Sequence, residues 1–536
     1  MSSINSIFSD RKTLVNEISQ ADAPEWDLII IGGGITGAAV LREAVRCGYR
    51  SLLIEQKDFA WGASSRSSKM VHGGLRYLAS GHFALTKDSL TERERLLSEA
   101  PDLVKRAGFY FIIRKGRFPG RWSMSIILKI YDYMAGVRDA CYYAGDKIQE
   151  RFRGIRSKGL KGGWYYTDAS TDDARLVLRL LQEASSHGGQ MLNYVKAKNL
   201  IIHQDKASGV TVENSVNGDV FDLRAKVVVN STGVWADKLR SQVNVEQRVR
   251  PLRGSHLVVA TSRIPIFDTL VSFHPADNRG VFIYHWEDVV LVGTTDLDHS
   301  GDLDIEPSIT NQEVDYLLQA VNFEFPDLAL SRDDIISTWA GVRPVIGSDK
   351  SKDPSKERRD HAVWMDKGLI TVSGGKLTTF RSIALDVLKA ACEELGHPTT
   401  VNDDDRVFAK VSIQAQELIP EDLDRARRLI GRYGERASEL LATAITDELT
   451  LIDGTQYCFA ECRWALRHEM VNHLDDLLLR RTRLGLLLPR GGEAVFAHLQ
   501  DMFTQELGYS DEKWRIELQR YQEIWRSSYS LPDEKK

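Results

Sequence analysis

A short apolar run that ends in a glycine-rich turn constrains the fold of this chain more than any other feature. Asp27 to Ile31 has the apolar, β-branched composition of a buried strand, and Gly32, Gly34 and Gly37 follow in the spacing Gly-x-Gly-x-x-Gly. The first glycine permits a tight turn, the second lets a pyrophosphate approach the backbone, and the third lets a helix pack closely on the strand. The pattern predicts a strand–turn–helix unit that binds a dinucleotide.

The residues after this turn complete the unit and restrict the dinucleotide. A helix is expected from about residue 36 to residue 47, with Gly48 as its C-terminal stop, and a strand over residues 51–54. That strand ends in Glu55, whose carboxylate suits a free ribose 2′-hydroxyl and would repel a 2′-phosphate. The sequence therefore disfavours NADP.

Residues 67–77 form a second informative block, Ser-Ser-Lys-Met-Val-His-Gly-Gly-Leu-Arg-Tyr. The paired glycines let the backbone approach a flat, bulky group. Lys69, His72 and Arg76 can meet anionic or proton-transferring groups. The block indicates both the kind of cofactor and a negatively charged substrate.

Composition excludes several classes of protein. At 536 residues the chain is too long for one core, so two or three domains are expected. A net charge of −5 gives no overall nucleic-acid footprint. Five scattered cysteines suggest a reducing compartment rather than a disulfide framework. The N-terminus has no secretory signal and no apolar run reaches about eighteen residues, so we expect a cytoplasmic protein without a membrane span.

Two patterns that resemble metal sites lack the spacing of metal ligands. His468 and His473 are five residues apart rather than four, which takes them off a common helix face. Cys458 and Cys462 lie one helical turn apart without a second cysteine pair, so burial is expected there rather than zinc. The sequence predicts no metal site.

Periodicity divides the chain into three regions. Residues 1–25 are a polar lead-in, and from there to about residue 400 strand and helix patterns alternate, with hairpins expected at 281–293 and 362–372. Residues 348–360 are expected to form a solvated loop. Beyond about residue 405 the apolar residues recur at helical spacing, as in Leu423, Ala426, Ile430, Tyr433, Ala437 and Leu441. This pattern predicts a helical C-terminal domain.

Six blocks in a fixed order resemble one known family. They are the glycine-rich turn, residues 64–69 with 72–77, Arg253-Gly-Ser-His256, Gly293-Thr-Thr-Asp296, Gly341-Val-Arg-Pro344 and Gly374-Gly-Lys-Leu-Thr-Thr-Phe-Arg381. Together they cover most of residues 27–385, and the tail with Leu477 to Leu484 resembles the family's C-terminal domain. The chain resembles the bacterial FAD-dependent glycerol-3-phosphate dehydrogenases, respiratory flavoenzymes related to the D-amino-acid-oxidase group.

The resemblance implies a fold of three parts. The first is a discontinuous α/β FAD-binding domain of the Rossmann-like, glutathione-reductase type, expected at 26–110, about 160–245 and 345–400. The second is an α+β substrate domain built on an antiparallel sheet, expected at about 110–160 and 246–344. The third is the all-α domain over residues 405–536.

The resemblance also implies how FAD is held. A helix that begins after Gly374 and Gly375 would place its free N–H groups near the flavin N1–C2=O edge and stabilise the anionic reduced flavin. Thr232 and Gly233 would line the adenosine side. The complete set of expected cofactor contacts is Gly32, Gly34, Gly37, Glu55, Ser67, Ser68, Lys69, His72, Gly73, Thr232, Gly233, Gly374, Gly375, Lys376, Leu377 and Thr378.

The implied substrate is sn-glycerol 3-phosphate, oxidised to dihydroxyacetone phosphate by hydride transfer to flavin N5. Phosphate requires cations, and Arg76, Arg343 and Lys376 are the candidates, with Tyr77, Thr295 and Asp296 as further substrate contacts. Arg381 is a fourth cation that would equally well pair with a structural carboxylate.

Proton removal from the substrate hydroxyl needs a base, for which histidine is suited. His256 and His72 are the candidates, and Arg343 is expected to assist in catalysis. The chain departs from the family's pattern at His285, where proline is usual, and at His299, where an aromatic residue is common. If either lines the pocket, a related polyol phosphate or another hydroxy compound is an alternative substrate.

The sequence does not decide the electron acceptor or the partners of the protein. A membrane quinone is implied by the resemblance, while an oxidase that uses oxygen, or a dehydrogenase of another hydroxy or amino acid, shares most motifs. Residues 110–138 place Arg114, Lys115, Arg117 and Arg121 beside a dense apolar stretch with Trp122, which suits an anionic lipid surface at the inner face of the cytoplasmic membrane. The alternative is a buried helix that packs on the substrate domain. A homodimer is a further open alternative.

Overall fold

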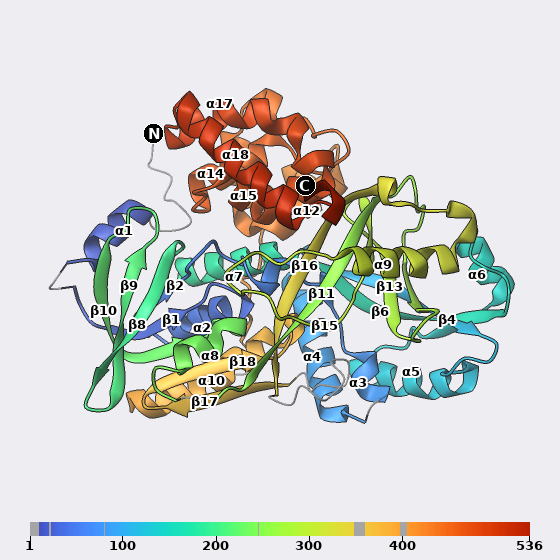
Figure 1. Ribbon diagram of the computed structural model, residues 1–536, viewed down its shortest axis with the longest axis horizontal. Coiled ribbons are helices and arrows are strands. Elements are labelled where there is room, and N and C mark those ends of the chain that lie inside the picture. The colour runs from blue at the N-terminus through green and yellow to red at the C-terminus, as the bar shows by residue number, and fades with distance from the viewer. Residues whose placement is uncertain are drawn as a thin grey trace.

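The computed structural model describes residues 10–20, 23–79, 81–244, 246–347, 360–396 and 405–535. Two β-sheets lie side by side, and a layer of helices from the C-terminal part of the chain lies across them (Figure 1). Most of the loop expected at 348–360 is outside the described residues. The predicted combination of an α/β domain, an antiparallel sheet and a helical C-terminal domain is confirmed.

The first sheet is the core of the dinucleotide-binding unit. Its strand order is β17-β18-β10-β1-β2-β7, and all neighbours in this order are parallel except β17 and β18. The strands are β1 (Trp26–Ile31), β2 (Ser51–Ile54), β7 (Gln190–Leu192), β10 (Val220–Asn230), β17 (His361–Asp366) and β18 (Leu369–Gly374). The predicted hairpin at 362–372 is therefore confirmed. A second hairpin, β8 (Val195–His203) and β9 (Lys206–Asn214), extends the sheet through the first half of β10.

Three helices pack together against this sheet through an apolar core. They are α2 (Ile35–Arg46), α7 (Asp173–Ser186) and α10 (Phe380–Leu395). The strand and helix expected around Gly32 and Gly48 lie within a residue of their predicted bounds. A Cβ atom on Gly37 would lie 1.9 Å from the carbonyl oxygen of Gly32, so only glycine lets α2 approach the strand this closely.

The lead-in is more structured than its polar composition suggests. α1 (Arg11–Ile18) buries Leu14, Val15 and Ile18 against the apolar side of the first sheet. Its polar residues face solvent. Because the helix is short and mostly polar, its apolar face was not recognised from the sequence.

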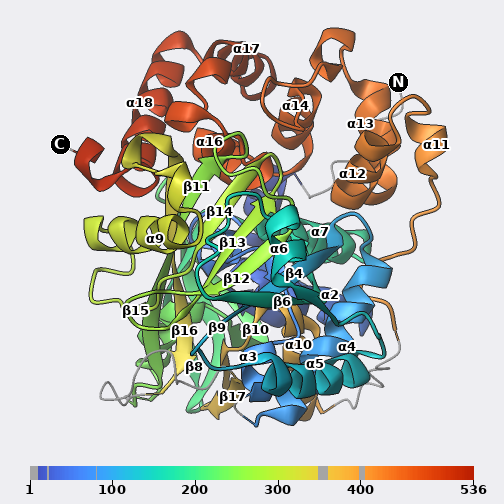
Figure 2. The same cartoon turned by 90° about the vertical axis from the view of Figure 1, so that its right-hand side faces the viewer.

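The second sheet has ten strands and carries the substrate side of the molecule (Figure 2). Its order is β15-β11-β14-β13-β12-β4-β6-β3, with β16 paired to β11 and β5 paired to β6; the β4–β12 pair is parallel. The strands are β3 (Met70–Val71), β4 (Val104–Arg114), β5 (Cys141–Ala144), β6 (Leu160–Thr171), β11 (Val249–Ala260), β12 (Thr269–Phe273), β13 (Gly280–Trp286), β14 (Val289–Gly293), β15 (Leu297–Asp298) and β16 (Ile335–Ile346). The hairpin predicted at 281–293 is β13 and β14.

Two strands of this sheet reach beyond the expected substrate-domain limits. β4 begins at Val104 and β6 ends at Thr171, and both lie fully in the second sheet. We therefore propose domain boundaries near residues 104 and 171, rather than about 110 and 160. The chain returns to the first domain at α7.

Further helices surround the second sheet. They are α3 (Leu75–Ala79), α4 (Phe83–Glu99), α5 (Arg121–Ala135), α6 (Gly145–Arg151) and α9 (Asn311–Glu324), while α8 (Ala236–Arg240) follows the first sheet's β10. None of the helices in the described ranges is long and apolar enough to cross a bilayer.

The C-terminal residues form the helical layer at the top of Figures 1 and 2. Its helices are α11 (Ala415–Leu418), α12 (Leu423–Tyr433), α13 (Ala437–Thr443), α14 (Phe459–His468), α15 (Leu474–Asp476), α16 (Leu484–Leu487), α17 (Phe496–Leu507) and α18 (Asp511–Ser528). A π-helical turn, Leu477–Arg481, joins α15 to the residues before α16. The helical spacing seen from Leu423 to Leu441 is divided between α12 and α13 at Gly434, which has a φ of +62°.

Candidate active site

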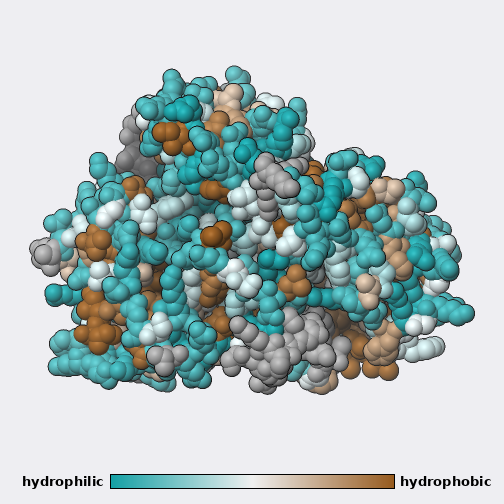
Figure 3. Space-filling view, in the orientation of Figure 1, coloured by the Kyte–Doolittle hydropathy of each residue, from teal (hydrophilic) through white to brown (hydrophobic). Residues whose placement is uncertain are grey.

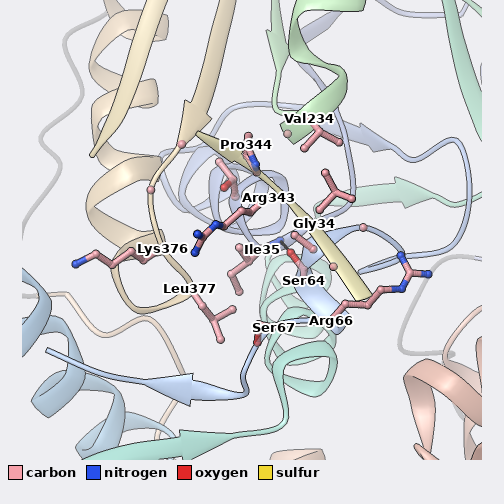
Figure 4. Close-up of a pocket in the computed structure, with 18 of the residues that line it drawn as sticks. Gly34, Ile35, Ser64, Arg66, Ser67, Val234, Arg343, Pro344, Lys376 and Leu377 are labelled. Atoms are coloured by element: carbon pink, nitrogen blue, oxygen red, sulfur yellow. Dashed lines mark hydrogen bonds between the residues drawn. The ribbon is translucent and has the colours of Figure 1, made fainter. Parts of the chain in front are cut away.

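All six motif blocks meet around one cavity with a volume of about 720 Å³. It is lined by residues from both sheets, from the turn after β1 and from the loop after β18. Blocks that are hundreds of residues apart in the sequence thus form a single site (Figure 4).

The turn after β1 has the geometry of a pyrophosphate cradle. Gly32 has a φ of +113°, and a Cβ atom there would lie 2.6 Å from the carbonyl oxygen of Ser231. Gly34 lines the cavity, and the Ile35 N–H at the start of α2 donates to the Ser64 hydroxyl at 2.9 Å. Helix N–H groups and the helix dipole there favour an anion.

Glu55 faces the same end of the cavity. Its carboxylate accepts hydrogen bonds from the Gly33 N–H at 2.7 Å and the Lys57 N–H at 2.9 Å. Burial raises the pKa of Glu55 above its usual value, although these two backbone donors oppose the shift. The fixed carboxylate lines the cavity with oxygen lone pairs to spare for a ribose hydroxyl.

The loop after β18 brings the start of α10 to the cavity. Gly374 and Gly375 both have a φ of +80°, and Cβ atoms there would lie 2.5 Å from the Asp360 carbonyl oxygen and 2.4 Å from Ile383. These glycines form the turn that places Leu377 and Thr378 on the cavity wall. The helix that follows has sixteen residues, so its N-terminus offers a substantial dipole to a group in the cavity.

His256 lies on β11 at the cavity wall and is almost fully buried, with 2% of its surface exposed. Its Nε2 lies 2.9 Å from the Ser68 hydroxyl, and its ring stacks on Trp339 at 4.8 Å. Its Nδ1 is buried and has no hydrogen-bond partner in the part of the chain that the structure describes. Burial, and then the charge of Lys69, lower the pKa of His256 to about 3, so the ring is neutral at physiological pH.

Two arginines converge on one carboxylate at another part of the wall. The Asp296 carboxylate pairs with Arg343 and, at 2.9 Å, with Arg279. Arg343 retains 31% exposure of its side chain, and all three residues line the cavity. Two guanidinium groups against one carboxylate leave an excess positive charge for an anionic ligand.

Lys376 and Tyr77 form a third part of the wall. The Lys376 ammonium lies 3.9 Å from the centre of the Tyr77 ring and donates to Ser89 at 2.9 Å. Figure 4 shows its side chain extending away from Gly34. The Tyr77 ring stacks at 6.5 Å on that of His72, so these three expected contacts lie together.

Several expected site residues lie behind the wall rather than on it. The ammonium of Lys69 is fully buried and pairs with Asp173 at 2.9 Å. The Gly73 N–H donates to Asp168 at 3.0 Å. Arg381 pairs with Glu92 at 3.1 Å, which answers the open alternative in favour of a structural carboxylate. Thr295, although on the wall, donates to Glu313 at 2.7 Å.

The remaining expected residues divide into three groups. Ser67, Ser68, Thr232 and Gly233 line the cavity. Arg76 belongs to α3, but its side chain is outside the described residues. The His285 ring lies 5.7 Å from that of Phe267 in a tilted arrangement. Phe282, three residues earlier on β13, faces the cavity, so His285 points to the opposite face of the strand.

Two residues of the cavity wall could not be recognised from the sequence. Arg279 precedes β13 in a loop, and Asp168 lies within a buried strand, where it accepts hydrogen bonds from Arg93 at 2.7 Å and Tyr131 at 2.8 Å. Neither belongs to a motif block. For Asp168, the only signal in the sequence is an acidic residue within a predicted strand, since a buried carboxylate is costly unless it is paired.

Comparison with known families decides the class of protein. Residues 27–384 match the family described as FAD dependent oxidoreductase, and residues 404–514 match the C-terminal domain of alpha-glycerophosphate oxidase. The chain belongs to the FAD-dependent oxidoreductases. The resemblance derived from the motif blocks is thereby confirmed, and FAD is the cofactor that the cradle fits.

Relatives narrow the position of the chain within the family. An aerobic glycerol-3-phosphate dehydrogenase from Staphylococcus haemolyticus is 32% identical over 501 residues, which cover 88% of each chain. The corresponding protein from Staphylococcus aureus is 33% identical over 486 residues, 85% of this chain and 86% of that one. The glycerol-3-phosphate dehydrogenase from Bacillus halodurans, solved with FAD, is 27% identical with a TM-score of 0.75, covering 97% of this chain and 98% of that chain.

The glycine at the pyrophosphate cradle gives a direct test of the cofactor's position. Replacing Gly34 by valine puts a branched side chain where the pyrophosphate approaches, beginning 3.1 Å from the Ser64 hydroxyl. We expect FAD content to fall from about one per chain to less than about a tenth, as read from flavin absorbance of the purified protein. Gly120→Val, at a glycine with open space around it, is the matched control and should keep its FAD. Stoichiometric FAD in Gly34→Val would refute this placement.

Proposed function

We propose that this protein oxidises sn-glycerol 3-phosphate to dihydroxyacetone phosphate with FAD as the electron acceptor in the site. The observation that carries the proposal is the joint presence, in one cavity, of a dinucleotide cradle, a neutral buried histidine and two arginines with excess positive charge. The names of the related dehydrogenases support the same substrate.

Each part of the wall has a role in this reaction. Arg343 and Arg279 would bind the phosphate, since guanidinium groups pair with phosphate oxygens in a bidentate way. His256, neutral and on the wall, would take the proton from the C2 hydroxyl. When bound, FAD accepts the two electrons and the hydrogen released from C2. The start of α10 would stabilise the negative charge that follows.

An anaerobic titration tests the substrate directly. We expect excess glycerol 3-phosphate to bleach the flavin absorbance of the holoenzyme in a stopped-flow instrument, whereas unphosphorylated glycerol should act poorly. If the flavin stays oxidised in excess glycerol 3-phosphate, the proposed substrate is wrong. The rates at which air and a soluble quinone analogue reoxidise the reduced flavin in the same sample distinguish an oxidase from a quinone-linked dehydrogenase.

The depressed pKa of His256 predicts an unusual pH response. The ring should stay neutral, and therefore able to accept a proton, down to well below its ordinary pKa of 6.5. An NMR titration of the substrate-free holoenzyme with labelled histidine, assigned with His256→Asn, should show no His256 titration between about pH 8 and pH 5. His473 is the internal reference, because burial, which would lower its pKa, is outweighed by the Glu517 and Asp476 carboxylates together, so that the pKa is raised. A His256 midpoint near that of a free histidine would contradict the buried geometry.

We further propose that the acceptor is a membrane quinone and that the protein docks on anionic lipid through α5. This helix buries Met124, Leu128 and Tyr131 against the second sheet. On its outer face Trp122, Ile126 and Tyr133 are 79%, 63% and 87% exposed. The inner face thus fits the packing alternative, while the outer face fits a surface that enters the lipid interface.

The surroundings of α5 support the same surface. Figure 3 shows hydrophobic residues gathered at the lower right, where Figure 1 places α5. Phe118 is 75% exposed just before the helix, and Lys115 and Arg121 are exposed beside it. Arg114 does not contribute, because it is buried and pairs with Glu324. Aromatic side chains flanked by cations are typical of a peripheral membrane contact.

Flotation with liposomes measures this contact. We expect the holoenzyme to float with vesicles that contain anionic lipid at low salt and to be released as salt rises. A variant with Trp122→Ser and Ile126→Ser should lose flotation and keep its flavin reduction by glycerol 3-phosphate. Failure of the unmodified protein to float at low salt, together with full-rate reduction of oxygen to peroxide, would favour the oxidase instead.

A further inference from the structure

A buried arginine of the helical domain reaches the back of the cavity wall. Arg483 lies between the π-helical turn and α16, and only 1% of its side chain is exposed. Its guanidinium donates to Asp172 at 2.8 Å and to Asp173, and to the carbonyl oxygen of Ser65 at 3.3 Å. One side chain therefore joins the helical domain, the start of α7 and the block at 65–69.

Asp173 passes this connection to the residues on the wall. Its Oδ1 pairs with Arg483 and with Lys69 at 2.9 Å. Its Oδ2 accepts hydrogen bonds from the Ser67 N–H at 3.0 Å and the Ser67 hydroxyl at 2.7 Å. Because both oxygens are engaged and the residue is fully buried, the carboxylate fixes the backbone of Ser67 to Lys69.

The fixed segment holds the side chain that contacts the histidine. Ser68 stands between Ser67 and Lys69, and its hydroxyl lies 2.9 Å from His256 Nε2. Its carbonyl oxygen accepts a hydrogen bond from Tyr284 at 2.7 Å. The Lys69 ammonium lies 4.8 Å from the Trp339 ring on which His256 stacks. A shift of this segment therefore moves the Ser68 hydroxyl at His256 and the Lys69 ammonium beside Trp339.

We propose that Arg483 is a positioning residue for His256, acting through Asp173 and the segment Ser67 to Lys69. The inference deepens the proposed function, since it rests on His256 as the proton acceptor. Arg483 itself touches neither the cavity nor the histidine. Its planar fork matters because it meets two carboxylates and the carbonyl oxygens of Ser65 and Leu479 together, which the single ammonium of lysine does not.

The matched pair Arg483→Lys and Arg480→Lys tests the proposal. Arg480 is equally buried in the same segment and also crosses to the first domain, where it pairs with Asp58. It makes no hydrogen bond to residues 65–69 among the described contacts. Both variants keep the charge, so both are expected to fold, with similar losses in thermal midpoint.

Two measurements separate positioning from stability. In the holoenzyme, flavin reduction at saturating glycerol 3-phosphate should slow by about 10- to 100-fold in Arg483→Lys and by less than about twofold in Arg480→Lys. Hydrogen exchange followed by mass spectrometry should show faster amide exchange over residues 65–72 in Arg483→Lys alone. Equal reduction rates in the two variants, or unchanged exchange over 65–72, would overturn the proposal.

A double-mutant cycle with Ser68→Ala tests the route. If Arg483 acts through Ser68, the double variant should reduce its flavin about as slowly as the slower single variant. Losses that multiply, or a Ser68→Ala variant with the rate of the unmodified enzyme, would refute this route. The His256→Asn variant distinguishes the two proposals. If His256→Asn reduces its flavin at the full rate, His256 is not the proton acceptor. If His256→Asn is slow while Arg483→Lys is not, Arg483 does not position His256.

Discussion

Replacing His256 by asparagine is expected to slow flavin reduction by glycerol 3-phosphate about 100- to 10,000-fold, the range typical for loss of a general base. His256 is the neutral, buried histidine on the wall, and asparagine fills much of its space beside Ser68 without accepting a proton well. Anaerobic stopped-flow absorbance at saturating substrate gives the rate constant.

The FAD content of His256→Asn should be unchanged, because His256 belongs to β11 of the second sheet, whereas the cradle at Gly34 begins α2 beside the first sheet. His72→Asn is the companion variant, since His72 lies on the wall beside Tyr77. A full-rate His256→Asn together with a slow His72→Asn would transfer the role of base to His72.

Replacing Arg343 by alanine is expected to lower kcat/KM for glycerol 3-phosphate about 10- to 1000-fold, or about 1.4–4 kcal/mol of lost charge-assisted contact. Its partner Asp296 would still be held by Arg279, so the local fold should persist. The companion Arg279→Ala should show a loss of the same kind, mainly in KM. Steady-state kinetics with a soluble acceptor give both parameters.

Unphosphorylated glycerol is the internal control for both arginine variants. Its slow oxidation should hardly change, because it has no phosphate for Arg343 or Arg279 to bind. Equal losses on glycerol and glycerol 3-phosphate would indicate damage to the fold and would contradict a phosphate-binding role.

The local parts of the fold could be predicted because each has a short-range cause. The β1–α2 unit follows from a β-branched run and three spaced glycines, and its bounds were accurate to a residue. The hairpin of β13 and β14 follows from two apolar runs around Glu287. The boundaries proposed near residues 104 and 171 depend on the pairing of β4 with β6, which sequence periodicity does not reveal.

The site was predicted as a set of blocks, but its charge pairing was not. Nothing in the sequence indicates that Lys69 turns inward to Asp173, and a carboxylate partner for Arg381 was an open alternative that did not identify Glu92. Asp296 was expected at the substrate, and the structure gives it two arginine partners, of which Arg279 belongs to no motif. Such pairs join residues from different elements, so they become visible only when the chain is folded.

The arginines near residue 480 show the same dependence of charge pairing on the folded chain. In sequence, the stretch Leu477 to Leu484 was matched only as part of the C-terminal domain, with no role given to Arg480, Arg481 and Arg483. In the structure each is at most 1% exposed and is paired with buried carboxylates. Arg481 and Arg483 pair with acidic residues more than 300 positions earlier, and Arg480 pairs both with one of these and with the nearby Asp475 and Asp476.

These pairs also decide whether the helical domain is a separable module. Asp58 is paired with Arg480 and Arg481, and Asp172 with Arg432 and Arg483, so the cations that neutralise both carboxylates belong to the other domain. Stripping the partners from a buried pair costs about 3–5 kcal/mol. Two such losses rival the net stability of about 5–15 kcal/mol of a whole domain. The flavin-binding half is therefore electrostatically incomplete without the helices, and the two halves should melt in one cooperative transition.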